Sequence, residues 1–232
     1  MFQIGGPAYS GTTLLTLLLD QDPVVCLDEP DFHNPEQSHR GLPVLAARFP
    51  GSPLPQRPEK ALSCAQAVDL MAECERAIHP RVFGMKTCNS TFLEYAEVYR
   101  ARGLRVVAIV RDIRDALVRP LPPWVDEPRL NAAYRAIWAE RERFDLWIRY
   151  EDLVASPGEV MPRVTRALGL VLPVRERWDA AAVPRQMLKA ERHALLKSGA
   201  IVRSRVGLWR TAGVQLSEET ARTAALMGYP PA

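Results

Sequence analysis

Short apolar segments alternate with amphipathic ones along most of the chain. Five segments rich in β-branched or aromatic residues predict buried strands, at Phe2–Ile4, Val24–Leu27, Arg81–Lys86, Leu104–Val110 and Asp145–Tyr150. Segments with helical periodicity lie between and after them, at Thr12–Leu19, Glu59–Ile78, Ser90–Arg102, Arg129–Phe144, Gly158–Leu168 and Ser217–Met227. This alternation predicts an α/β fold with a parallel sheet and right-handed crossover connections.

Local signals mark the ends of some of these elements. Asn89 or Ser90 is a candidate cap for the third predicted helix, and Gly103 is expected to end it. Many of the 20 prolines fall between Pro35 and Pro58 and between Pro120 and Pro128. We expect those two stretches to be loops.

A glycine-rich run separates the first predicted strand from the first predicted helix. It reads Gly5-Gly6-Pro7-Ala8-Tyr9-Ser10-Gly11-Thr12-Thr13. Such a loop directs backbone N–H groups and the positive end of a helix at one point, so it binds phosphate or sulfate oxygens. The Gly6-x-x-x-x-Gly11 spacing is that of a nucleotide-triphosphate loop, but Thr12 replaces its lysine, which disfavours an ordinary ATPase or GTPase. A turn that only caps a core helix is the alternative.

Two cations end or follow other predicted strands. Lys86 ends the third strand and Arg111 directly follows the fourth. Ligands of an open parallel sheet gather at the carboxyl ends of the strands, so both cations should lie near the glycine-rich loop. Arg111 offers a planar fork suited to a second phosphate. The alternative is an ordinary cluster of ion pairs among Arg111, Asp112, Arg114 and Asp115.

Composition narrows the class of protein. The 232 residues are 47% apolar and 25% charged, which is typical of a globular chain, and we expect residues 1–232 to form one domain. A net charge of +3 without a basic, aromatic surface argues against a nucleic-acid partner. The sequence predicts neither a membrane span nor a leader, so we expect a cytoplasmic protein with no membrane partner. No metal is expected, because the cysteines lack paired ligand spacing: Cys26, Cys64, Cys74 and Cys88.

Four motifs, in order, resemble those of the sulfotransferases that use 3′-phosphoadenosine 5′-phosphosulfate (PAPS). They are the glycine-rich loop, the run from Arg111 to Asp115, Tyr150-Glu151-Asp152-Leu153, and Val206-Gly207-Leu208-Trp209-Arg210. The likeness covers nearly the whole chain and is greatest to the bacterial and tyrosylprotein-type branch, whose Gly-Asp-Lys-Thr-Pro segment is similar to Gly84-Met85-Lys86-Thr87-Cys88. It implies a P-loop-containing three-layer sandwich with a five-stranded parallel sheet, PAPS as cofactor and adenosine 3′,5′-bisphosphate (PAP) as product.

The resemblance also implies which residues bind the cofactor. Four loop residues would hold the 5′-phosphosulfate, Ser10, Gly11, Thr12 and Thr13, and Ala8 and Tyr9 of the same loop are also expected to contact the cofactor. Arg111 would hold the 3′-phosphate, together with Arg119, which stands where the family has a serine. Tyr150 would contact the adenine region. A region of about residues 185–215 would cover the nucleotide, with contacts from Arg205, Trp209 and Arg210.

Position 9 departs from the family pattern. A lysine or arginine usually precedes the loop serine and neutralises the bridging oxygen as the sulfuryl group leaves, whereas this chain has Tyr9. A phenol donates a hydrogen bond but carries no charge. We assign this role to Lys86, which resembles a lysine near the leaving group in the tyrosylprotein branch; a slow or inactive enzyme is the alternative.

Transfer to a hydroxyl also needs a general base. Glu29 matches the family's catalytic glutamate after the second strand and is the first candidate, although a gapless count places Pro30 opposite the second of two adjacent glutamates in the tyrosylprotein branch. His33 is the second candidate, because the ordinary pKa of imidazole suits proton abstraction at neutral pH. A solvated loop charge is the alternative for each.

The acceptor is expected to meet an insertion of about residues 34–80 and the proline-rich stretch that contains Trp124. Trp124 and Trp138 either line an acceptor pocket or belong to the core. We expect transfer of a sulfuryl group from PAPS to a hydroxyl of a small-molecule acceptor, such as a secondary metabolite. The alternatives are a peptide tyrosine sulfotransferase, a P-loop small-molecule kinase, and a degenerate nucleotide-binding protein without turnover.

Overall fold

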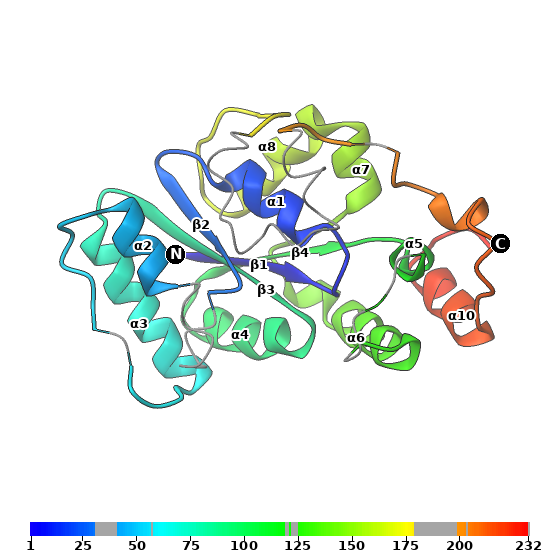
Figure 1. Cartoon of the computed structure of the whole chain (residues 1–232), viewed down its shortest axis with the longest axis horizontal. Helices are drawn as coiled ribbons and strands as arrows, with labels where there is room; N and C mark the ends of the chain where they lie inside the picture. The colour runs from blue at the N-terminus through cyan, green and yellow to red at the C-terminus, as the bar shows by residue number, and fades with distance from the viewer. Residues whose placement is uncertain are drawn as a thin grey trace.

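A parallel five-stranded sheet forms the centre of the molecule (Figure 1). The computed structural model describes residues 1–30, 41–56, 58–118, 121, 125–178, 199–202 and 204–231. The strands are β1 (Phe2–Gly6), β2 (Val24–Asp28), β3 (Val82–Cys88), β4 (Arg105–Val110) and β5 (Leu146–Arg149). They lie in the order β2-β3-β1-β4-β5, so β1 has β3 on one side and β4 on the other. The α/β prediction is confirmed, and the point where strand order reverses lies at β1.

Helices cover both faces of the sheet and give the three layers expected (Figure 1). One face carries α1 (Thr12–Leu19), α7 (Tyr150–Ala155) and α8 (Pro157–Ala167). The other carries α2 (Leu42–Arg48), α3 (Cys64–Ala77), α4 (Asn89–Ala101) and α6 (Glu127–Ala139). Two further helices, α5 (Ile113–Leu117) and α10 (Glu218–Leu226), pack together beside α6.

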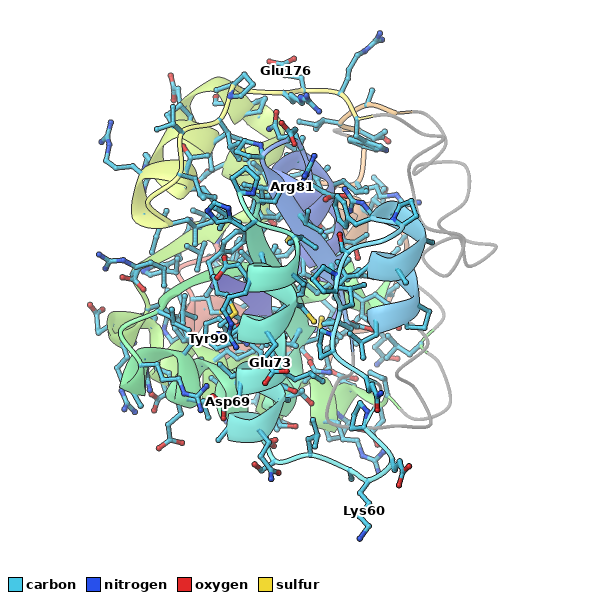
Figure 2. The ribbon with its side chains drawn as sticks, turned by 90° about the vertical axis from the view of Figure 1, so that its left-hand side faces the viewer. Lys60, Asp69, Glu73, Arg81, Tyr99 and Glu176 are labelled. Carbon is cyan, nitrogen blue, oxygen red and sulfur yellow. The ribbon has the colours of Figure 1, made fainter. Side chains whose placement is uncertain are left out.

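Alternate residues of the strands pack into two separate cores. Phe2 and Ile4 of β1 face α1 and α8, whereas Phe83 and Met85 of β3 face α3 and α4. Both faces of the sheet are therefore apolar, which explains why the strands appear in the sequence as continuous apolar runs. Figure 2 views the molecule from the side of α3.

The side of α3 away from the sheet is polar. Asp69 and Glu73 are exposed there, whereas Tyr99 of α4 is fully buried (Figure 2). Helix α3 is therefore amphipathic, with its apolar side packed toward the sheet.

Several boundaries differ from those predicted. Helix α3 begins at Cys64 rather than Glu59, because Ser63 and Gln66 form a reciprocal capping box. Helix α2 forms inside the proline-rich stretch expected to be a loop, with its proline in the first turn, where no helical donor is lost. Helix α6 spans Glu127–Ala139 instead of Arg129–Phe144, because Asp126 caps it two residues earlier than expected. The short helices α5 and α7 were not predicted.

Two residues also have places other than those expected. Tyr150 begins α7 instead of ending β5. Cys88, and neither Asn89 nor Ser90, occupies the N-cap position of α4, and no side chain caps that end. Gly103 follows the end of α4 with a φ of 68°, in agreement with the prediction.

Candidate functional site

The glycine-rich loop joins the end of β1 to the start of α1 with no room for side chains at two positions. A methyl carbon on residue 6 would lie 2.1 Å from the Ile109 carbonyl oxygen, and one on residue 11 would lie 2.3 Å from the Tyr150 ring. Gly11 also has a φ of 97°, which favours glycine. The loop therefore has the close backbone approach and the helix start that an oxyanion cradle needs.

Ser10 is the buried polar residue of this loop. Its hydroxyl is fully buried and has no hydrogen-bond partner among the residues that the structure describes. A buried, unpartnered hydroxyl costs free energy unless something satisfies it. This orphaned donor at the start of a helix fits a bound phosphate or sulfate oxygen.

Three non-glycine residues of the described chain have left-handed backbone angles, and each follows the carboxyl end of one of the strands β1, β2 and β3. Tyr9 (φ 66°) follows β1, Glu29 (φ 46°) follows β2 and Asn89 (φ 55°) follows β3. Such angles cost about 1–3 kcal/mol each and cluster at functional sites. Asn89 also accepts a 2.8 Å hydrogen bond from the Ala8 amide, which ties the loop to the start of α4.

Lys86 and Glu29, two of the predicted catalytic residues, lie in direct contact. Lys86 Nζ is 2.8 Å from Glu29 Oε1 and 2.5 Å from Asp28 Oδ1. The lysine is 2% exposed, and it lies on the sheet face covered by α1. The backbone amide of Glu29 donates to the Lys86 carbonyl, which extends the pairing of β2 and β3 by one residue.

A cysteine connects this pair to the loop. Cys88 Sγ lies 3.7 Å from Lys86 Nζ and 3.6 Å from Thr12 Oγ1. Thr12 is buried, whereas Thr13 in the first turn of α1 is half-buried. The loop and the catalytic candidates therefore form one continuous group at the carboxyl edge of the sheet.

The pKa of Lys86 is set by opposing effects. Burial lowers it, while electrostatic interactions with Asp28, Cys88 and Glu29, in that order, raise it, and the net pKa lies well above its usual value. Lys86 is therefore an ammonium group at neutral pH. Burial raises the pKa of the Cys88 thiol to about 11, so that group is neutral.

Arg111 lies at the same edge, after β4, and is 1% exposed. Its Nη2 donates to the Arg205 carbonyl and lies 3.3 Å from Asp115 Oδ2, while its guanidinium stacks on Tyr150 at 4.6 Å. Its Nε has no partner among the described residues. The ion-pair cluster that was the alternative interpretation of Arg111 is thus present, and Arg114 completes it through hydrogen bonds from Nε and Nη2 to the two carboxylate oxygens of Asp112.

The C-terminal segment is held to this cluster. Asp115 accepts hydrogen bonds from the backbone amides of Gly207 (2.8 Å) and Trp209 (3.1 Å). Arg114 stacks on the Trp209 ring at 4.0 Å, and Arg210 lies 5.4 Å from the same ring. Arg205 contacts Arg111 directly, whereas Trp209 and Arg210 join the cluster through Asp115 and Arg114.

Several of the remaining predicted residues are not among those that the structure describes. His33, Arg119 and Trp124 fall outside the described residues, as do four basic residues of the expected cofactor-covering region: Lys189, Arg192, Lys197 and Arg203. Trp138 packs edge-on against Trp147, with 4.9 Å between ring centres, which fits its alternative as a core residue. Within the described ranges no group of three or more His, Cys, Asp or Glu side chains is placed to hold a metal ion. No described helix is long and apolar enough to cross a membrane.

Sequence reasoning assigned no specific role to three residues at the site, although Asp28 belongs to the run of candidate bases after the second predicted strand. Asp28, Asn89 and Tyr229 each contact it: Asp28 pairs with Lys86, Asn89 accepts from the loop, and Tyr229 donates to Glu151 at 3.0 Å. Asp28 stands next to Glu29 at a strand end, which is the same signal that selected Glu29. The other two act through single long-range hydrogen bonds, which leave no local pattern.

Comparison with solved structures identifies the fold. The sulfotransferase domain of the Synechococcus PCC 7002 olefin synthase is 17% identical with a TM-score of 0.67, over 99% of this chain and 94% of that one. The sulfotransferase domain of the curacin biosynthetic pathway is 18% identical with a TM-score of 0.69, over 100% and 98%. Mouse sulfotransferase SULT7A1 in complex with PAP is 12% identical with a TM-score of 0.52, over 99% and 88%. No protein-family model and no curated protein matched.

Proposed function

Because the chain has the fold of sulfotransferase domains, we propose that it transfers a sulfuryl group from PAPS to a hydroxyl of a small-molecule acceptor. One observation carries the proposal. The glycine-rich loop and the Arg111 cluster lie at one sheet edge, and each holds a buried donor without a described partner, Ser10 Oγ and Arg111 Nε. Two separate buried donors of this kind fit a nucleotide that has phosphate groups at two ends.

The residues at the two positions fit the two ends of PAPS. The loop from Ala8 to Thr13 would hold the 5′-phosphosulfate through backbone amides, the Ser10 hydroxyl and the start of α1. Arg111 would hold the 3′-phosphate, as arginine suits planar recognition of phosphate, with Arg119 as a further predicted contact. Adenosine would lie between them, with contacts from Tyr150, Arg205, Trp209 and Arg210. SULT7A1, which has a related fold, was solved with PAP.

Lys86 and Glu29 would divide the chemistry. When bound, PAPS supplies the sulfuryl group, whose bond to the 5′-phosphate oxygen breaks as a bond to the acceptor oxygen forms. Glu29 would take the hydroxyl proton, for which general-base catalysis is worth about 10²- to 10⁴-fold. The Lys86 ammonium would balance the negative charge that develops on the departing phosphate. It would thereby take the role of the lysine or arginine that the family usually has at position 9, where this chain has Tyr9.

Two measurements on the unmodified protein test the proposal. Calorimetry should show that PAP binds at least about tenfold more tightly than ATP, because ATP lacks the 3′-phosphate. Transfer of ³⁵S from labelled PAPS to a panel of phenols, aliphatic alcohols and a tyrosine peptide should label a small hydroxyl compound. Lys86→Ala should abolish this labelling while PAP still binds.

Each alternative has its own outcome in these measurements. Failure of PAP to bind overturns the proposal at its base, and preferential binding of ATP favours a kinase. Labelling of the peptide alone favours a tyrosylprotein sulfotransferase. PAP binding without transfer to any acceptor contradicts an enzymatic function.

A further inference from the structure

Lys86 faces more negative charge than one ammonium group neutralises. Two carboxylates contact its Nζ, Asp28 at 2.5 Å and Glu29 at 2.8 Å. Among the residues that the structure describes, the remaining titratable contact is the Cys88 thiol at 3.7 Å, which is neutral at pH 7. One of the two carboxylates therefore suffices as counter-ion, and the other is in excess. The reaction proposed above assigns a role to Glu29 and none to Asp28.

The backbone fixes Asp28 opposite Lys86. The two residues are register partners on the adjacent parallel strands β2 and β3, so their side chains leave the same face of the sheet. Asp28 is 12% exposed and has a short side chain. Its Oδ1 lies 2.5 Å from Lys86 Nζ, which is ion-pair distance.

Glu29 makes a different kind of contact. It lies beyond the end of β2, its backbone is left-handed at a φ of 46°, and its side chain is 35% exposed. Its longer side chain reaches back to Nζ from outside the sheet. A more exposed, longer carboxylate exchanges partners at a lower cost than one at the end of a buried strand.

We infer that Asp28 is the permanent counter-ion of Lys86 and thereby a positioning residue that lets Glu29 exchange its lysine contact for an acceptor hydroxyl. This inference rests on the proposed function for its chemistry. Its structural content is independent of that function: Asp28 holds the charge of Lys86 in place more strongly than Glu29 does. Without Asp28, Lys86 would retain Glu29 as its only carboxylate among the described residues.

Asp28→Asn and Glu29→Gln form a matched pair for the test, since each removes one negative charge and keeps the side-chain shape. The chain has four lysines, Lys60, Lys86, Lys189 and Lys197, so lysine ¹³C-NMR resolves few signals and Lys86→Met assigns the one of interest. We expect Asp28→Asn to lower the pKa of Lys86 by roughly one unit more than Glu29→Gln does. This titration needs no nucleotide and no turnover.

Turnover gives the second measurement. Glu29→Gln should reduce the rate about 10²- to 10⁴-fold at every pH, as expected for loss of the base. Asp28→Asn should reduce it by only about tenfold at neutral pH and shift the alkaline limb of the rate profile to lower pH, because Lys86 then loses its proton more easily. Asp28→Glu, which restores the charge, should return the alkaline limb most of the way to its original pH. A purely structural role would not move it.

An equal or larger pKa change in Glu29→Gln would overturn the inference and make Glu29 the counter-ion. If Asp28→Asn does not fold, double-mutant cycles on thermal stability decide instead, with Asp28→Ser and Glu29→Gln each combined with Lys86→Met. The Asp28–Lys86 coupling should then exceed the Glu29–Lys86 coupling, and the reverse order contradicts the inference. If PAP does not bind but the NMR titration gives the expected order of pKa changes, the proposed function is rejected and the role of Asp28 as counter-ion stands.

Discussion

The glycine-rich loop and the Arg111 cluster prepare for an anion in opposite ways. The loop is built from neighbouring residues, and its Ser10 hydroxyl is buried without a described partner. Arg111 is also buried, but the Arg205 carbonyl, Asp115 and the Tyr150 ring already surround its guanidinium. An anion at the loop adds a contact to a hydroxyl that has no described partner. An anion at Arg111 can also contact Nε, which has no described partner, but it must join or replace contacts that the rest of the guanidinium already makes.

This difference means that the glycine-rich loop and the Arg111 cluster should contribute differently to the stability of the fold and to anion binding. A group with no partner in the protein contributes little to folding, so its removal should affect binding alone. A group that already pairs with backbone and carboxylate contributes to both. Substitutions in the loop and at Arg111 should therefore give different combinations of stability and affinity.

The largest effect is expected at Gly6. Gly6→Ala places a methyl carbon 2.1 Å from the Ile109 carbonyl oxygen, a backbone atom in the centre of the sheet. We expect a loss of about 3 kcal/mol or more in the free energy of unfolding, measured by urea denaturation. Gly158→Ala in α8 is the control, because nothing lies within 4 Å of the added carbon. It should be neutral or stabilise by up to about 1 kcal/mol.

Arg111→Ala should have the next largest effect, on both PAP affinity and thermal stability. Loss of a charge-assisted contact to phosphate should weaken PAP binding about 10- to 100-fold in calorimetry. The melting temperature should fall as well, since the variant leaves Asp115 buried beside the C-terminal segment with no arginine partner at position 111. Undiminished PAP affinity would contradict the assignment of this arginine to the 3′-phosphate.

Ser10→Ala should have the smallest effect. It distinguishes the loop from the Arg111 cluster most clearly, because it should change PAP affinity without lowering stability. The variant removes a buried hydroxyl that has no described partner, so the melting temperature should stay the same or rise. PAP binding should weaken by about three- to tenfold, because the hydroxyl would then be absent from the bound anion. A melting temperature that falls as far as that of Arg111→Ala would show that Ser10 has a structural partner after all.

The comparison also explains what the sequence predicts well. The loop is encoded by consecutive residues, so its place between β1 and α1 and the need for Gly6 and Gly11 follow from the letters alone. The approach of Lys86 to Glu29 follows from parallel strands that end at one edge. These are consequences of short-range pattern and sheet topology.

The parts that could not be predicted depend on single contacts between distant segments. The Ala8–Asn89 hydrogen bond joins residues 81 positions apart, and the Asp115–Gly207 bond joins residues 92 apart. Asn89 and Asp115 each have a conventional local interpretation, as a helix cap and as an ion-pair partner. The structure gives Asn89 a different role, and it gives Asp115 a second role beside its pair with Arg111.

The close approach of Tyr150 to the loop has a consequence for related sequences. The ring of Tyr150 occupies the volume in which a side chain on residue 11 would begin. A larger amino acid at position 11 would therefore have to adopt the left-handed backbone angle and would also need a smaller side chain at position 150. Across homologues these two positions should change together. Glycine at position 11 should accompany an aromatic residue at position 150, and a bulkier residue at position 11 should accompany a smaller residue at position 150.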